Sequence, residues 1–260
     1  MELFSILKAK AGIPVDDVMA RLYAGRRKTP AVELMPHMDG VTNYYDCTLG
    51  LTSGSWKNQV QGGNDAVLTG VTVADDGAAQ ILCTSDSCGY FESGNAPGDS
   101  VCVYAVFKSP PITGSLPYAN RFVIGSYDRN SSSTCFSFAI DGWSYDNTVM
   151  ADFHGTGAGT NYSATNYRVL VANKNMNASS SNVSFYVDSG ASAASIFTDT
   201  YDTGYKWGLG YLCYNDGNKD FGAQNHAVQI RFLAVTNQSH SAEQIAENMA
   251  WIREHFGMDG

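Results

Sequence analysis

Near the end of the chain, Ala227-Val-Gln-Ile-Arg-Phe-Leu-Ala-Val235 leads through a short polar turn into Ser241-Ala-Glu-Gln-Ile-Ala-Glu-Asn-Met-Ala-Trp-Ile-Arg-Glu-His-Phe256, and this ending decides the fold class. In the first segment the apolar side chains of Val228, Ile230 and Phe232 repeat every second residue. This is the period of a strand that buries one face, so the segment predicts a strand over residues 226–235.

The second segment has the spacing of an amphipathic helix. Its apolar stripe consists of Ile245, Met249, Ile252 and Phe256. Ser241 is followed three residues later by Gln244, which is the pattern of a capping box and marks the start of a helix. We therefore expect a helix over residues 242–256 that packs on the outside of the domain through its apolar stripe.

Composition and turn signals indicate a large, sheet-rich domain. The chain has 260 residues, of which 44% are apolar and 16% charged, with 26 Gly, 15 Tyr and 12 Phe. Short apolar alternations separated by Gly, Asn and Asp turns predict strands at residues 66–73, 78–83, 101–108, 121–127, 134–140, 147–153, 166–173, 182–188, 206–214 and 226–235. Many short strands at such intervals are typical of a sandwich or barrel. The predicted fold class is all-β, a two-sheet antiparallel jelly-roll sandwich.

The first thirty residues differ from the rest and predict a short helical segment. A first helix has an apolar stripe with Leu3, Phe4 and Leu7, and Gly12-Ile-Pro14 interrupts it. A second short helix has Val18 and Leu22 inward, and Arg26 and Arg27 lie near the end of the segment. An isolated helix of this length is marginal in water, so the stripe must pack against something. Two alternatives stay open, the sandwich of the same chain or other subunits. Our hypothesis is a docking or self-association segment at 1–30, followed by the sandwich at 31–260.

Charge and cysteine content exclude several function classes. The first thirty residues carry a net charge of +3 and the remaining 230 residues −12, within a total of −9. An acidic body argues against nucleic acid, whose phosphates require a basic face. No apolar run reaches the roughly 18 residues of a membrane helix, and the first residues do not resemble a secretory signal. The six cysteines are therefore expected to be reduced thiols.

Three segments, in order, resemble one family. They are Trp56-Lys-Asn-Gln-Val-Gln-Gly-Gly-Asn-Asp-Ala-Val-Leu-Thr-Gly70, Val183-Ser-Phe-Tyr-Val-Asp-Ser-Gly190 and the ending with Thr236-Asn-Gln-Ser-His-Ser-Ala-Glu-Gln-Ile-Ala-Glu-Asn248. Together they are similar to the laminin-G-like branch of the concanavalin A-like lectin/glucanase superfamily. The resemblance spans roughly residues 40–256. It implies a lectin-like sandwich, and with an extra N-terminal element it implies a structural protein of phages or prophages, located in the virion.

The sequence argues against the catalysis known in part of that superfamily. Glucanases of this fold place two carboxylates two residues apart on one strand, facing the sugar cleft. This chain has no Asp or Glu pair at that spacing, and its histidines have no metal-ligand spacing. We therefore expect a non-enzymatic virion component, such as a head or tail fibre or decoration protein, that displays a glycan-binding sandwich. The alternative is a glycan-active enzyme or a free lectin.

A loop between two predicted strands is the candidate glycan site. It reads Asp141-Gly-Trp-Ser-Tyr-Asp-Asn147, and its candidate ligand-binding residues are Asp141, Trp143, Tyr145, Asp146 and Asn147. Aromatic rings stack on sugar faces, and carboxylate and amide groups bind hydroxyls. The alternative is a hairpin in which Trp143 covers the edge of the core, because aromatic side chains first of all bury area.

A second polar turn is a candidate calcium site. Asp216, Asn218 and Asp220 place oxygen ligands at every second position, an arrangement that suits a hard cation. The alternative is an ordinary polar hairpin, because Asn, Asp and Gly are the usual turn residues. Apart from this calcium, no cofactor is expected. The expected partners are other virion proteins, further copies of the chain and a cell-surface glycan.

Overall fold

The computed structural model describes residues 34–93, 100–109, 121–128, 133–140, 148–153, 156–163, 165–175, 181–188, 190–197, 206–214, 216–222 and 226–258. From Pro36 onward they belong to one unit of the chain. The predicted helical segment at 1–30 lies outside the described residues. In the described part, no helix has the length and apolar character needed to cross a membrane.

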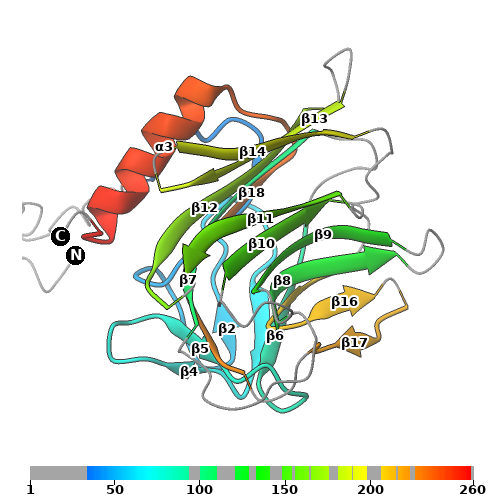
Figure 1. Ribbon diagram of the computed structural model, residues 1–260. Helices are drawn as coiled ribbons and strands as arrows, with labels where there is room; N and C mark the ends of the chain where they lie inside the picture. Colours follow the sequence, from blue (N-terminus) through cyan, green and yellow to red (C-terminus); the bar gives the residue numbers. More distant parts are fainter. Residues whose placement is uncertain are drawn as a thin grey trace, which may run out of the picture. The chain divides into compact units, whose positions relative to one another are not determined.

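Sheet A forms one layer of a sandwich (Figure 1). Its strand order is β14 (Gly190–Phe197), β13 (Ser181–Val187), β12 (Arg168–Asn175), β7 (Val101–Lys108), β18 (Val228–Thr236), β5 (Ala79–Ile81) and β4 (Thr72–Val73), and β1 (Val41–Asp46) also pairs with β18. The predicted strand at 226–235 is therefore confirmed as β18, which lies in the middle of the sheet. All pairings in sheet A are antiparallel.

Sheet B forms the other layer. Its order is β11 (Thr156–Ser163), β10 (Thr148–Phe153), β9 (Ser133–Ile140), β8 (Arg121–Asp128), β15 (Lys206–Leu209), β6 (Cys88–Glu92), β3 (Ala66–Thr69) and β2 (Ser55–Trp56). A hairpin of β16 (Leu212–Tyr214) and β17 (Lys219–Asp220) joins it, and β16 runs parallel to β8. The predicted two-sheet sandwich is thus confirmed, with this parallel pairing as its exception.

The core between the two sheets is rich in aromatic side chains. Its largest members are fully buried: Tyr45, Trp56, Phe91, Phe136, Phe138 and Trp207. Trp207 stacks on Phe136 with ring centroids 4.9 Å apart and lies 5.5 Å from Phe91. The indole N–H of Trp56 donates to the carbonyl of Asp46 at 2.9 Å, so the polar atom of that ring is satisfied inside the core.

Two predicted strands are wrong in their extent, because a glycine interrupts each. The strand expected at 66–73 splits into β3 and β4 around Gly70, which has φ +56°. The strand expected at 206–214 splits into β15 and β16 around Gly210, which has φ +82°. In this left-handed region the chain leaves the extended conformation. After Gly70 the chain moves from sheet B to a pairing with β5 in sheet A, and after Gly210 its pairing with β8 changes from antiparallel to parallel.

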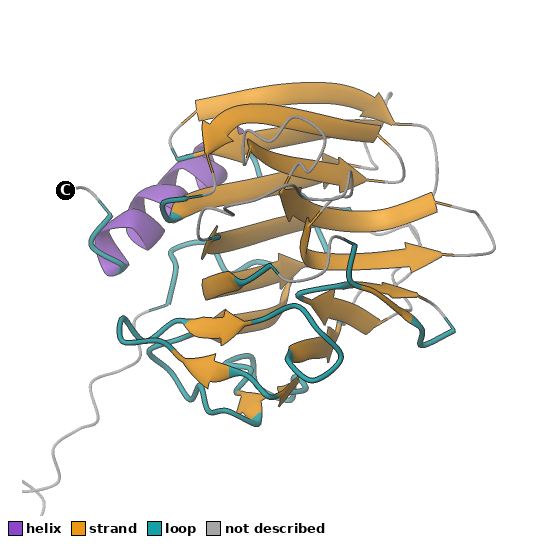
Figure 2. Ribbon diagram, turned by 60° about the horizontal axis from the view of Figure 1, so that its bottom comes forward, coloured by secondary structure: helices purple, strands orange, loops and turns teal. Residues whose placement is uncertain are grey.

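The closing helix, α3 (Ala242–His255), is confirmed with its predicted cap (Figure 2). The Ser241 hydroxyl accepts from the Gln244 amide, and the Gln244 side chain accepts from the Ser241 amide. Ile245, Met249 and Ile252 are buried, and the helix packs against β12 of sheet A. Phe256 follows as the C-cap, one residue beyond the helix.

Polar contacts also tie α3 to sheet A. The carboxylate of Asp46 is fully buried and accepts from Nε2 of His255 at 2.8 Å, at the end of the helix. Before the helix begins, Nδ1 of His240 lies 2.7 Å from the Tyr104 hydroxyl inside the domain. Burial lowers the pKa of His240, which keeps this imidazole neutral.

Candidate functional site

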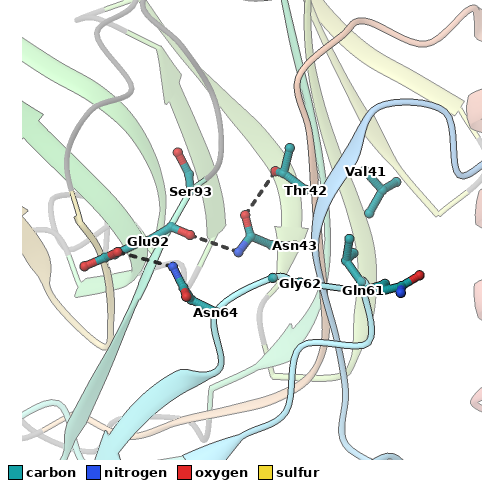
Figure 3. A pocket seen from close by; sticks show the side chains of 10 residues that line it. Val41, Thr42, Asn43, Gln61, Gly62, Asn64, Glu92 and Ser93 are labelled. Carbon is teal, nitrogen blue, oxygen red and sulfur yellow. Dashed lines mark hydrogen bonds between the residues drawn. The ribbon is translucent and has the colours of Figure 1, made fainter.

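A polar hollow of about 350 Å³ opens beside the first strand of sheet A (Figure 3). It is lined by Val41, Thr42, Asn43, Val60, Gln61, Gly62, Gly63, Asn64, Glu92 and Ser93. These residues come from β1, from the loop between β2 and β3, and from the end of β6. The hollow therefore combines segments from both sheets.

The floor of the hollow is fixed by Asn43, which is almost fully buried. Its amide nitrogen donates to the Glu92 carbonyl at 3.0 Å and to the Tyr45 hydroxyl at 3.1 Å. Its amide oxygen accepts from the Thr42 hydroxyl at 3.0 Å. This side chain thus bonds β1 of sheet A to the end of β6 in sheet B and holds the two sides of the hollow together.

The loop that borders the hollow is organised by Asn58. Its side-chain oxygen accepts from the backbone amides of Tyr44 and Val60, each at 3.0 Å. Its own backbone amide donates to the Asp65 carboxylate at 2.9 Å. A Cβ added at Gly63 would lie 2.3 Å from the Asn58 amide nitrogen, so glycine is needed where the loop folds back on this side chain. Hydrogen bonds of Asn58 and the close approach at Gly63 therefore shape this loop.

Asn64 and Glu92 present exposed polar groups above this floor. The Asn64 amide nitrogen donates to a Glu92 carboxylate oxygen at 3.4 Å, and the other carboxylate oxygen lies 3.9 Å from the Lys206 ammonium. The Tyr45 hydroxyl donates to the Asn64 carbonyl at 2.9 Å. Burial raises the pKa of Tyr45 against the lowering effect of its Asn43 hydrogen bond, so the hydroxyl stays protonated and keeps Asn64 in place.

The groups that line the hollow can bind a ligand mainly through hydrogen bonds. It offers amide donors, amide and carbonyl acceptors, and the Glu92 carboxylate. Among the described residues that line it there is no lysine, arginine or aromatic side chain, and Glu92 is the one with a carboxylate. The hollow thus suits a neutral ligand with many hydroxyl groups.

The sequence predicted other residues as site residues. All five candidate residues of the 141–147 loop are outside the described residues, as are the proposed docking residues of the N-terminal segment. Asn43, Asn64 and Glu92 were not predicted as site residues. The Gln-Gly-Gly-Asn run that ends at Asn64 is a recognisable polar turn, but no signal in the sequence links it to Glu92, 28 residues later.

The candidate calcium residues lie on the β16–β17 hairpin. Both carboxylate oxygens of Asp216 accept from Asn218, from its backbone amide at 3.0 Å and its side-chain amide at 2.8 Å. The Asp220 carboxylate accepts from the Tyr214 hydroxyl at 3.0 Å and the Gly222 amide at 2.8 Å. These are the hydrogen bonds of a polar turn. Calcium binding here stays a prediction.

No protein-family model matches the chain, and no curated protein matches it in sequence. Among solved structures, the fold is similar to the botulinum neurotoxin type G receptor-binding domain, with a TM-score of 0.60 and 10% identity. It is also similar to the binding domain of Paraclostridial mosquitocidal protein 1, at 0.63 and 9%. The botulinum neurotoxin serotype D ligand-binding domain in complex with N-acetylneuraminic acid matches at 0.61 and 9%.

These matches cover 82% of this chain and 51–52% of the other chains, so this chain spans about half the length of the structures it matches. At such low identity the likeness shows the fold alone, a two-sheet β-sandwich. The laminin-G-like assignment stays a prediction.

Proposed function

We propose that the sandwich is a non-enzymatic carbohydrate-binding module and that the polar hollow is its sugar site. The proposal rests on one observation, the pair of exposed groups from Asn64 and Glu92 above a hydrogen-bonded floor. Sugar hydroxyls both donate and accept hydrogen bonds, so an amide next to a carboxylate matches two neighbouring hydroxyls. Charge-assisted bonds to Glu92 supply the stronger part of the interaction.

Electrostatics favour a neutral sugar. The chain has a net charge of −9, and the described lining residues add one carboxylate and no lysine or arginine. The ammonium of Lys206, 3.9 Å from Glu92, lies outside this lining. A sugar that carries a carboxylate would be repelled by Glu92. We therefore expect this module to prefer neutral glycans, although one structural neighbour was solved with N-acetylneuraminic acid.

The number of carboxylates supports binding without hydrolysis. Glycosidases that cleave by the common mechanisms place two carboxyl groups on either side of the glycosidic bond, about 5–9.5 Å apart. Among the described residues that line the hollow, Glu92 has no second carboxylate beside it. The structural neighbours are titled as receptor-binding, binding and ligand-binding domains.

We expect Glu92→Ala and Asn64→Ala to weaken glycan binding. A hydrogen bond to a charged group contributes roughly 1.5–3 kcal/mol, so the loss of Glu92 should lower the affinity by about 10- to 100-fold. Glu243→Ala is the matched control, because Glu243 is also exposed but lies on α3. Titration calorimetry with the neutral glycan that gives the strongest array signal provides the affinities. Equal affinities for Glu92→Ala and the control would place the sugar site elsewhere.

We further propose that this module is displayed on a phage particle, as a head or tail fibre or decoration protein. The support is the resemblance of three segments to laminin-G-like domains that occur in such proteins. In this proposal the apolar stripe with Leu3, Phe4 and Leu7 docks on the particle, and Arg26 and Arg27 face an acidic neighbour.

Deleting residues 1–28 should then prevent incorporation of the protein into particles. The expected loss is nearly complete, because the deletion removes both the apolar stripe and the basic cluster. Quantitative immunoblotting of purified particles measures the incorporation, and circular dichroism of the truncated protein checks that its sandwich is intact. Normal incorporation of a folded truncated protein would refute the docking role.

A further inference from the structure

The two sides of the sandwich end in very different edge strands. On one side sheet A ends with the two-residue strand β4 and with β1, and sheet B ends with the two-residue strand β2. The outer side of β1 is covered by a loop, because the Tyr44 amide donates to the Asn58 side chain and the Tyr44 carbonyl accepts from the Gln59 amide. On the other side the sheets end with β14 and β11, which have eight residues each and contact one another (Figure 1). Very short edge strands, and edges covered by a loop, leave few backbone groups unpaired, which prevents pairing with other chains. Among the described strands, the first side is protected in these ways, whereas β14 and β11 are long.

The long edge strands also lack the residues that usually prevent edge strands from pairing with other chains. β14 reads Gly-Ala-Ser-Ala-Ala-Ser-Ile-Phe over 190–197, and β11 reads Thr-Gly-Ala-Gly-Thr-Asn-Tyr-Ser over 156–163. Neither strand contains a charged residue or a proline, which are the residues that normally keep exposed edges apart. In the part of the chain that the structure describes, no strand pairs with the outer edge of β14. Among the described strands, the backbone N–H and C=O groups on that edge of β14 thus have no ladder partner.

Of the two strands, β14 is the better template for a further strand. Its pairing with β13 runs without interruption over five positions, from Ser181 opposite Phe197 to Phe185 opposite Ala193. The β13–β14 pairing shifts register beyond this stretch, between Phe185 and Tyr186. The pairing of β11 with β10 is uninterrupted over only four positions after its shift between Thr148 and Met150, and β11 contains two glycines against one in β14. Glycine and register shifts both weaken a regular ladder.

We propose that a second copy of this chain pairs with β14 through its own β14, in antiparallel orientation. Such a twofold contact places the strand beside an identical strand, so any net charge on the strand would face the same net charge on its copy. β14 and the neighbouring β13 carry no charge, although the chain as a whole has a net charge of −9. At this edge two acidic copies can therefore approach without bringing like charges together. Sheet A then continues from one copy into the other.

The test introduces charge into the uninterrupted part of β14. Because successive side chains of a strand point to opposite faces, Ala193→Lys with Ala194→Lys puts a lysine on both faces. Thr72→Lys with Val73→Lys is the matched control, because both residues are exposed on the short edge strand β4. Light scattering of the full chain over a dilution series measures the mass, and circular dichroism measures the fold.

We expect the unaltered protein and the β4 variant to show twice the monomer mass of 28.0 kDa, and the β14 variant to show the monomer mass. Opposed lysines should weaken the association by at least about tenfold. A monomer at all concentrations of the unaltered protein overturns the proposal. So does a folded β14 variant that keeps the double mass, because the copies then associate elsewhere.

Amide hydrogen exchange keeps the proposal testable if the β14 variant fails to fold. In the unaltered protein, the protection of amides in 190–197 should rise with protein concentration, while that of β4 should not change. Protection in 190–197 that is independent of concentration overturns the proposal. This outcome is distinct from the glycan titration, because the association does not involve the polar hollow.

Discussion

Replacing Trp207 by alanine should lower the free energy of unfolding by about 3–5 kcal/mol, the cost typical of removing a large aromatic side chain from a packed core. Trp207 is fully buried in β15, and its ring packs against Phe136 and Phe91 between the two sheets. The truncation leaves a cavity that the surrounding strands fill only in part. Urea denaturation followed by circular dichroism measures the loss.

Trp251→Ala is the matched control, because the same substitution removes a ring that is only partly buried. Trp251 lies on α3 and stacks on His255 with centroids 4.5 Å apart. We expect its loss to cost about 1 kcal/mol, the typical effect of a substitution outside the core. Equal effects of the two substitutions would contradict the position of Trp207 between the sheets.

Gly70→Ala should also destabilise the domain severely, by roughly 2–5 kcal/mol, because strain and a steric clash add. Gly70 has φ +56°, a backbone conformation that is energetically unfavourable for any residue with a side chain. A Cβ at this position would in addition overlap the backbone carbonyl oxygen of Asp86, which cannot rotate away as a flexible side chain would.

Gly77→Ala separates the effect of the backbone strain from that of the steric clash. Gly77 has φ +83°, but a Cβ added at this residue would meet no atom within 4 Å. Alanine should therefore cost about 1–2 kcal/mol there, from the backbone conformation alone. Thermal or urea denaturation of both variants compares them. A cost at Gly70 no larger than that at Gly77 would mean that the turn after β3 can move away from Asp86.

The sequence predicts the end of the chain well because the signals there are local. The alternation in β18 and the spacing of Ile245, Met249 and Ile252 give the strand and the helix, and Ser241 with Gln244 marks the boundary. Each of these patterns needs only neighbouring residues. The capping box in particular forms between two side chains and two amides that are three residues apart.

The strand β1 is not predicted from the sequence because both of its faces are covered. In β1 the four residues from Asn43 to Asp46 are all buried, so no alternation of polar and apolar residues appears. Tyr45 packs on Trp56 in the core, while the Asp46 carboxylate bonds to His255 of α3 on the other side. A strand between a core and a helix loses the period of two that identifies a half-exposed strand.

The candidate site could not be predicted because its residues meet only in the folded chain. Asn43, Asn64 and Glu92 lie on three different segments, and the contact between Asn64 and Glu92 depends on the pairing of β3 with β6. Local reasoning instead favours turns rich in aromatic and acidic residues, such as the 141–147 loop. Whether that loop contributes to glycan binding stays a prediction, and its substitution can be tested on the same array.

A glycan array with parallel hydrolysis assays on the same polysaccharides tests the central claim most directly. We expect the unaltered protein to bind a set of neutral glycans, to bind their sialylated forms less tightly, and to release no sugar from any of them. Binding without turnover is the result that a single carboxylate in a hydrogen-bonding hollow predicts. Release of sugar from any polysaccharide, or an array on which no glycan binds, would contradict the account.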